Sequence, residues 1–128
     1  MELISKRYYN KKDINKEINN ILNEVGLLEY ALYYPNQLSG GMNQRVNIAR
    51  ALLIQFNIMI MDEPFKSIDR DNKVKIIANM KNRFNKSNVT VIFVTHNDEE
   101  TSVLADKVIR LDGEPVNVVE EYYVDIKK

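Results

Sequence analysis

The sequence has no cysteine and no excess of either charge. Without cysteine, its 128 residues can form neither a disulfide framework nor a thiolate metal site, which fits a reducing compartment. The 18 Lys and Arg residues are balanced by 18 Asp and Glu residues. A neutral chain lacks the bulk positive charge with which proteins attract nucleic acid or an anionic membrane, so we expect no nucleic-acid partner.

Long apolar runs are also missing. No stretch approaches the roughly 20 apolar residues that a membrane-spanning helix needs. The N-terminal stretch MELISKRYYNKKDINKE is too polar for a secretory signal, so a cytoplasmic location is expected. What the chain does have is 45% hydrophobic residues, which is enough for the core of one domain.

The part of the chain before residue 56 is predicted to be helical. Isoleucine, leucine and valine recur at three- and four-residue spacing over residues 13–28, which predicts an amphipathic helix that Gly26 can end. After a turn at residues 33–36, Ser39 is expected to cap a second helix that runs to about Gln55. The side chains expected to face inward on this second helix are Val46, Ala49, Leu52 and Leu53.

From residue 56 onward, strand and helix patterns alternate. Strands are expected at residues 58–61, 89–94, 107–111 and 116–119, and helices at residues 71–84 and 97–105. This alternation predicts a parallel sheet with right-handed crossovers.

Several finer expectations follow from the same patterns. The apolar runs at residues 58–61 and 89–94 are typical of strands buried on both faces. Asn97 and Glu100 are expected to form a capping pair. Asp112-Gly113 is expected to be a two-residue hairpin turn. Inward residues of the helix over 71–84 are expected to be Val74, Ile77, Ala78 and Phe84.

Reactive side chains follow two of the predicted strands. Asp62 and Glu63 come after the first, and His96 comes after the second. Ligands of open parallel sheets bind at the carboxyl ends of strands, so these groups suit hydrolysis of a nucleoside triphosphate. One carboxylate could hold Mg²⁺ through water, and the other could orient or deprotonate the attacking water. Taken singly, each also has a plain explanation, as a polar turn or a structural histidine.

The stretch LSGGMNQRVNIARAL, residues 38–52, raises a separate question. Ser39 alone would cap the helix, yet Gly40 and Gly41 follow it. Two glycines in a first turn lower helix stability by roughly 1 kcal/mol each relative to alanine. Some other interaction must offset that cost.

Four motifs, taken together and in order, resemble those of the nucleotide-binding domain of ATP-binding cassette (ABC) transporters. LSGGM with QRVNIARAL resembles the signature motif, and IMIMDEP resembles Walker B with its catalytic glutamate. SID at residues 67–69 resembles the D-loop, and VTH at residues 94–96 resembles the switch histidine. The resemblance covers about residues 13–111.

This resemblance implies an α/β fold, the C-terminal part of a P-loop NTPase domain of the ABC ATPase kind. The chain would be one partial domain over residues 1–128. Its helical signature subdomain would span about residues 13–55, and the remainder of the catalytic core about residues 56–128. The core would lack the P-loop strand.

The resemblance also gives the signature residues a role. Ser39 would bond a γ-phosphate oxygen of ATP held by an opposing subunit, and Gly40 and Gly41 would let the backbone approach. The N–H groups and partial positive charge of the helix N-terminus suit this anion, which would offset the cost of the glycines. Met42 would belong to the same site, which contacts ATP held by the opposing subunit. It stands at a position where glutamine is the commoner residue.

Roles for the other motif residues follow in the same way. The resemblance implies that Glu63 is the general base and that Asp62 assists Mg²⁺ binding through a water molecule. Ser67 and Asp69 of the D-loop would work across the dimer, and His96 would sense the γ-phosphate. The implied cofactors are ATP and Mg²⁺.

The largest departure from the family is the missing P-loop. The chain has four glycines, and none lies in the pattern G-x-x-x-x-G-K-[ST]. Neither Gln37 nor Tyr8 or Tyr9 fits the Q-loop glutamine or the adenine-stacking residue. We therefore expect that the chain alone neither binds ATP tightly nor hydrolyses it. The missing strand would leave an apolar edge on residues 89–94, filled either by residues 107–111 or by another chain.

Finer features resemble one group of importers. Met42, Phe65 and the segment THNDEE…LADKVIRL are most like importer ATPases of the nitrate, sulfonate and taurine type. The implied partners are a second nucleotide-binding subunit, identical or different, a membrane permease subunit, and a separate chain carrying the P-loop. The location would be cytoplasmic, peripheral at the inner face of the cell membrane.

Three alternatives stay open. The chain could be a non-catalytic module that supplies its signature motif to another subunit's ATP, or the product of a truncated gene. Chromosome-maintenance and translation-factor ATPases share the signature motif, but the neutral chain shows neither a basic stripe nor coiled-coil heptads.

Overall fold

The computed structural model describes residues 11–125, which form two compact units divided between Val94 and Thr95. Each unit is described by itself. Tyr8 and Tyr9 lie outside the described residues. Within residues 11–125, no helix is both long enough and apolar enough to span a membrane.

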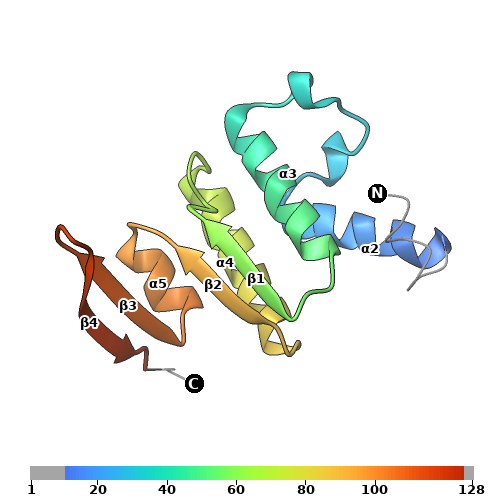
Figure 1. Cartoon of the computed structure of the whole chain (residues 1–128). Helices are drawn as coiled ribbons and strands as arrows, with labels where there is room; N and C mark the ends of the chain where they lie inside the picture. Colours follow the sequence, from blue (N-terminus) through green and yellow to red (C-terminus); the bar gives the residue numbers. More distant parts are fainter. Residues whose placement is uncertain (1–10, 126–128) are drawn as a thin grey trace. The chain divides into compact units, whose positions relative to one another are not determined.

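The first unit begins with the two predicted helices (Figure 1). Helix α2 spans Lys11–Glu24 and helix α3 spans Gly40–Leu53. Gly26 has φ +68°, a left-handed backbone that glycine adopts without a steric penalty, so it ends α2 as predicted. The prediction that this helix reaches residue 28 is wrong. Two short 3₁₀ helices, η1 (Leu28–Tyr30) and η2 (Pro35–Gln37), connect α2 to α3.

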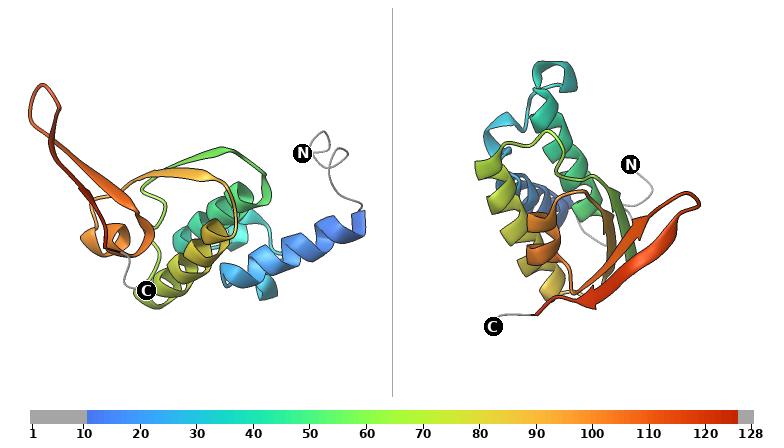
Figure 2. Two further views of the ribbon diagram at one scale, coloured as in Figure 1. Left: turned by 90° about the horizontal axis from the view of Figure 1, so that it is seen from below. Right: turned by 90° about the vertical axis from the view of Figure 1, so that its left-hand side faces the viewer.

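A parallel β–α–β arrangement completes the first unit. Strand β1 spans Ile58–Asp62, helix α4 spans Arg70–Asn85 and strand β2 spans Thr90–Val94. The strands pair in parallel, as predicted, with Ile60 opposite Ile92 and Asp62 opposite Val94. Helix α4 runs along one face of the pair (Figures 1 and 2).

Only one face of β1 is buried. Met59 and Met61 are 7% and 8% exposed, whereas Ile58 and Ile60 are 60% and 73% exposed. The prediction of burial on both faces is therefore wrong for the described residues, because the helices of this unit cover a single face. Strand β2 likewise alternates between half-buried and exposed residues.

The buried stripe of α4 also differs from the prediction. Val74 is 60% exposed and Ala78 is exposed, while Ile76, Ile77 and Met80 are buried. On α3, Val46 and Leu53 are half-buried. The core of the first unit consists of Ile21, Val25, Leu27, Ile48, Ala49, Leu52, Met59, Met61, Phe65, Ile68, Ile76, Ile77 and Met80.

An ionic contact adds to the apolar packing between α2 and α4. The Arg83 guanidinium lies 2.9 Å from a carboxylate oxygen of Glu24 and 3.0 Å from one of Glu17. These bonds raise the pKa of Arg83, with the hydrogen bond to Glu24 as the largest cause. They hold the C-terminal part of α4 against α2.

The second unit contains a short helix and a β-hairpin. Helix α5 spans Asp98–Leu104, and strands β3 (Lys107–Asp112) and β4 (Asn117–Tyr123) pair antiparallel. In the part of the chain described, β1–β2 and β3–β4 form two separate sheets. Whether residues 107–111 or another chain replace the missing P-loop strand stays a prediction. The expected subdomain boundary near residue 55 stays a prediction.

The β3–β4 connection is longer than predicted. Residues 113–116 form the turn, so the prediction of a two-residue turn at Asp112-Gly113 is wrong. Pro115 has no N–H to donate to a strand ladder, which explains why β4 begins only at Asn117. The Asn117 side chain donates to the Pro115 carbonyl at 2.6 Å and closes the turn.

The start of α5 agrees with the predicted N-cap. The Asn97 side chain accepts a hydrogen bond from the Glu99 N–H at 2.9 Å. Glu100, expected to complete the cap, is buried, and its carboxylate accepts a 2.6 Å bond from the Thr95 hydroxyl. The same Thr95 oxygen accepts from the Asn97 N–H at 3.1 Å.

Candidate functional site

The N-terminus of α3 is open to its surroundings. Ser39 is the N-cap, as predicted, and its exposed hydroxyl accepts from the Met42 N–H at 3.2 Å. A Cβ atom added at Gly40 would meet nothing within 4 Å. The first N–H groups of a helix have no partners within the helix, so an exposed first turn can receive an anion.

The neighbouring glycine lies in a different environment. A Cβ atom at Gly41 would stand 2.6 Å from the backbone carbonyl oxygen of Ser67, closer than real Cβ contacts. Gly41 therefore permits a close approach between α3 and the segment after β1. Of the two glycines, only Gly40 faces open space, a distinction that the sequence does not reveal.

Asp62 and Glu63 lie where β1 ends. Asp62 is exposed and Glu63 is half-buried. The Glu63 N–H donates to the Val94 carbonyl at 2.9 Å, so the candidate base follows directly on the β1–β2 pair. His96 is exposed and belongs to the second unit.

The segment after β1 has a strained backbone. Glu63 has φ +45° and Ser67 has φ +69°, both in the left-handed region that residues other than glycine seldom adopt. Such conformations cost about 1–3 kcal/mol each and persist where the surroundings enforce them. Phe65 and Ile68, which are 2% and 8% exposed, anchor this segment in the core.

Asp69 is the N-cap of α4. Its carboxylate accepts two bonds from Asn72, one from the side-chain amide at 2.7 Å and one from the backbone N–H at 3.1 Å. The side-chain bond is the largest cause that lowers the pKa of Asp69, followed by the backbone bond. The expected D-loop carboxylate is thus ionised and held in one orientation, although it is exposed.

Three polar residues near this site were not singled out from the sequence. Gln44 donates from its side chain to the Pro64 carbonyl at 2.9 Å. Arg45 is buried and donates toward Asn72 at 3.4 Å. The sequence feature that could have identified Gln44 and Arg45 is their spacing: they follow Gly41 by three and four residues and therefore share its helix face.

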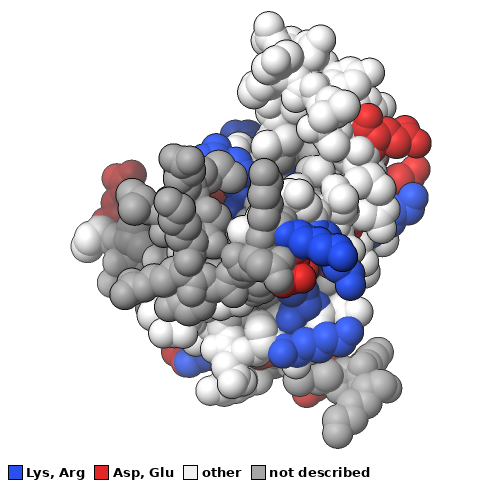
Figure 3. Space-filling view, turned by 90° about the vertical axis from the view of Figure 1, so that its right-hand side faces the viewer, with Lys and Arg blue, Asp and Glu red and all other residues white. Residues whose placement is uncertain are grey.

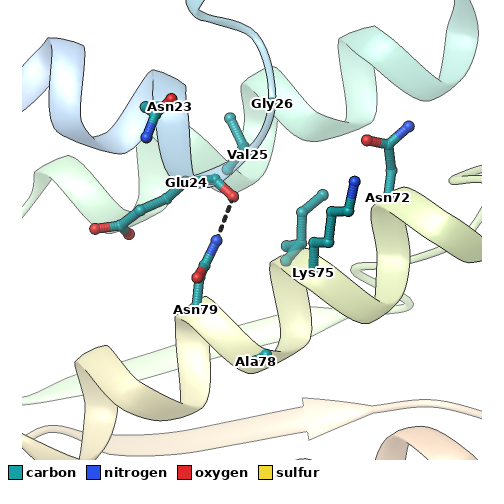
Figure 4. A pocket seen from close by; sticks show the side chains of 9 residues that line it. Asn23, Glu24, Val25, Gly26, Asn72, Lys75, Ala78 and Asn79 are labelled. Carbon is teal, nitrogen blue, oxygen red and sulfur yellow. Dashed lines mark hydrogen bonds between the residues drawn. The ribbon is translucent and has the colours of Figure 1, made fainter.

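A groove lies between the end of α2 and helix α4 (Figure 4). Asn79 donates across it to the Glu24 carbonyl at 2.8 Å, and Lys75 and Asn72 lie along the same side. None of the residues expected at the nucleotide site lines this groove. It is therefore a second concave region and not the candidate nucleotide site.

The loop before α3 is apolar and uncharged over most of its length. Leu32 is 93% exposed, and Tyr34 is 73% exposed. Residues 27–43 contain one acidic residue, Glu29, and neither lysine nor arginine. In Figure 3 the uppermost part of the surface accordingly lacks blue and red atoms.

A magnesium site is not complete in the part of the chain described. Across residues 11–125, no three His, Asp or Glu side chains gather as a metal-binding cluster. Mg²⁺ in nucleotide sites keeps several waters and takes one or two carboxylates plus substrate phosphates. The exposed Asp62 at the end of β1 fits such a single-carboxylate role.

Nucleotide-binding α/β proteins bind their ligands at the carboxyl ends of parallel strands, and here Asp62 and Glu63 lie at the carboxyl end of β1. The family model described as ABC transporter matches residues 2–66, about half of the chain. The chain therefore belongs to the ABC transporter family.

Similar curated proteins are import ATP-binding proteins. The spermidine/putrescine import ATP-binding protein PotA of Ureaplasma parvum is 37% identical over 113 residues, covering 88% of this chain and 22% of that protein. The sulfate/thiosulfate import ATP-binding protein CysA of Rhodopseudomonas palustris is 41% identical over 100 residues, covering 78% of this chain and 29% of that protein. The chain thus spans less than a third of the length of these relatives.

Their names do not support the narrower resemblance to importers of the nitrate, sulfonate and taurine type. A putative 2-aminoethylphosphonate import ATP-binding protein, PhnT of Salmonella typhimurium, is 40% identical over 104 residues, covering 78% of this chain and 28% of that protein. What these relatives share in name is import and ATP binding.

The solved structures give the same fold. The dimeric ATP-binding cassette MJ0796, in a post-hydrolysis state bound to ADP and Pi, matches with a TM-score of 0.79 and 29% identity. The match covers 94% of this chain and 51% of that one. An ATP-bound bacterial Atm1-family exporter matches with a TM-score of 0.66 at 24% identity, which shows the fold alone. The predicted fold class, a partial ABC ATPase domain, is confirmed.

Proposed function

We propose that this chain is the signature-motif part of the ATP-binding subunit of an ABC importer. In this proposal, the N-terminus of α3 binds the γ-phosphate of ATP held by an opposing subunit. The observation that carries the proposal is the exposed first turn of α3, with Ser39 at the surface and open space beside Gly40.

The chemistry of this turn suits a triphosphate. The Ser39 hydroxyl can turn from the Met42 N–H toward a phosphate oxygen, and the backbone at Gly40 can approach without a side chain in the way. The unsatisfied N–H groups and the helix dipole both favour an anion. Met42 is half-buried beside this turn.

The carboxylates after β1 take the catalytic roles in this proposal. Glu63 is the general base, Asp62 holds Mg²⁺ through water, and His96 contacts the γ-phosphate. Mg²⁺ would neutralise charge on the phosphates. Ser67 and Asp69 face the opposing subunit across the dimer.

ATP itself is held by a P-loop outside these 128 residues. The exposed face of the β1–β2 pair supports this. Ile58, Ile60 and Ile92 are 51–73% exposed, whereas parallel sheets are normally covered on both faces. A P-loop strand and its helix, from another part of the protein or another chain, would cover this apolar surface.

The partners follow from the same assignment. They are a second nucleotide-binding subunit and a membrane permease, with the protein peripheral at the inner face of the membrane. The resemblance to importer ATPases of the nitrate, sulfonate and taurine type stays a prediction from Met42, Phe65 and the segment after Thr95, and the sequence does not identify the transported substrate. The three relatives reported above are named for polyamines, sulfate and an aminophosphonate.

A binding experiment with two substitutions at one position tests the central claim. The partner is MJ0796 carrying a hydrolysis-blocking substitution and loaded with ATP, and capture of this chain is measured by light scattering or pull-down. Ser39→Asn and Ser39→Asp both keep a good N-cap and so preserve α3. We expect Asn to retain ATP-dependent capture and Asp to lose it at least tenfold, because its carboxylate would face the phosphates. Equal capture by the two variants would contradict the proposal.

The catalytic part has its own test. The purified chain alone is expected to show no ATPase activity, because the P-loop pattern is absent from it. Activity in the purified chain that Glu63→Gln abolishes would show that the chain needs no P-loop from elsewhere.

A further inference from the structure

One face of α3 contacts the whole segment that carries the candidate carboxylates. Gly41, Gln44 and Arg45, here called the α3 clamp, stand at positions i, i+3 and i+4 and therefore share a face. Gly41 lies against the Ser67 carbonyl, Gln44 bonds the Pro64 carbonyl, and Arg45 reaches Asn72. The first two contacts lie within residues 63–69, and the third reaches the first turn of α4.

Arg45 is the most constrained member of the clamp. It is only 9% exposed, and its Nη1 donates to the carbonyls of Val25 and Gly26 at 3.1 and 3.0 Å. Its buried Nε has no hydrogen-bond partner among the described residues. Burying a guanidinium is costly unless its donors find acceptors. The position of Arg45 is therefore fixed by the carbonyls at the end of α2.

Asn72 transmits this fixed position to the D-loop carboxylate. Its side-chain oxygen accepts from Arg45 at 3.4 Å, and its side-chain nitrogen donates to Asp69 at 2.7 Å. The two ends of the amide have opposite hydrogen-bonding character, so only this orientation satisfies both neighbours. Asn72 thus links a buried cation to an exposed carboxylate.

The segment between these contacts needs such support. Glu63 and Ser67 both have left-handed backbone conformations. Glu63 directly precedes Pro64, whose carbonyl Gln44 bonds, and the Ser67 carbonyl lies against Gly41. Left-handed conformations of this kind persist only where the surroundings over-determine them.

We propose that Gln44 and Asn72 are positioning residues, through which the α3 clamp fixes the segment from Glu63 to Asp69 to the signature helix. The face of α3 that begins at Gly41 then sets where the segment carrying Glu63 and Asp69 lies. This consequence matters for catalysis only if the proposed function is correct, but the coupling itself belongs to this chain and needs no nucleotide.

Gln44→Leu tests the first link in the full 128-residue chain. It keeps the shape of the side chain and removes the donor to Pro64. We expect hydrogen exchange at the Lys66 and Ile68 amides, which bond the Glu63 and Phe65 carbonyls at 3.2 Å, to become about fivefold faster.

A matched control is available on α4. Asn79→Leu removes a side-chain bond of the same type, to the Glu24 carbonyl at 2.8 Å, but outside the clamp. It should leave exchange at Lys66 and Ile68 unchanged. Equal acceleration by both variants would mean general loosening and would overturn the proposal, as would no acceleration by Gln44→Leu.

Asn72→Asp tests the second link without cutting the first. The aspartate can still accept from Arg45, but it cannot donate to Asp69 and adds a like charge beside it. We expect the NMR titration of the Asp69 carboxyl to move to clearly higher pH, while α4 stays folded. An unchanged titration would overturn the role of Asn72. Because this measurement uses no ATP and no partner, it can fail or succeed independently of the Ser39 capture experiment.

Discussion

Gly40 and Gly41 are neighbouring glycines, yet their replacement by alanine should change the stability of the chain in opposite directions. Both lie in the first turn of α3, where alanine favours the helix by about 0.5–1 kcal/mol over glycine. At Gly40 nothing lies within 4 Å of the added methyl group. Gly40→Ala should therefore stabilise the chain by about 0.5 kcal/mol, the low end of that range because first turns fray.

At Gly41 the same helix preference is opposed by a collision. The methyl group would stand 2.6 Å from the Ser67 carbonyl oxygen, which belongs to backbone and not to a flexible side chain. Relieving it requires a shift of the left-handed Ser67 or of α3. Overpacking of this kind costs about 1–3 kcal/mol. We expect Gly41→Ala to destabilise the chain by about 1–2 kcal/mol, net of the gain in helix preference.

Urea unfolding followed by circular dichroism measures both variants against the unmodified chain. The midpoints should separate, with Gly40→Ala above and Gly41→Ala below. In the ATP-dependent capture experiment both variants should bind less, Gly40→Ala in spite of its higher stability. A Gly41→Ala chain as stable as Gly40→Ala would refute the reasoning, because the contact with Ser67 would then carry no energetic weight.

Three further predictions concern the ionic contacts and the sheet. Arg83→Ala should lower the free energy of unfolding by about 1–2 kcal/mol, because its two partly buried bridges are lost. Arg110→Ala removes more exposed bridges and should lower it clearly less in the same urea assay. The pKa of Asp69 is lowered in the folded chain, so its carboxylate stabilises the fold above the unfolded pKa near 4, and this contribution is lost as the pH falls through the folded pKa. In Asp69→Asn the free energy of unfolding should therefore depend less on pH when it is measured from pH 5 downward. Ile60→Lys should reduce aggregation in light scattering with little change in melting temperature, since Ile60 is 73% exposed, whereas Met59→Lys should unfold the chain.

Periodicity located the α-helices and strands within residues 11–125, but not the 3₁₀ helices η1 and η2. The spacing of apolar residues located α2, α3 and α4, and short apolar runs located β1, β2 and β3. Burial was harder to predict, because it depends on what covers each face. The alternating exposure of Ile58 and Ile60 with Met59 and Met61 arises from coverage on one side, and no pattern within IMIMD distinguishes that from coverage on both.

The sequence singles out candidate site residues but not the contacts between them. Asp62, Glu63 and Ser39 stand out because strand ends and helix caps have local signatures. The roles of Gln44 and Asn72 depend on a contact between segments 20 to 27 residues apart. Such contacts have no local signature, so only the structure reveals them.

The contacts made by α3 explain how the left-handed backbone at Glu63 and Ser67 is maintained. A left-handed glutamate at the end of a strand would relax unless neighbouring groups held it. Helix α3 contacts the next residue, Pro64, and the second left-handed residue, Ser67. The helix whose exposed end is proposed to bind phosphate is therefore the same helix that holds the turn of the candidate base. The proposed phosphate site at Ser39 and the turn that carries Glu63 are thus connected through α3 by the contacts at Gly41 and Gln44.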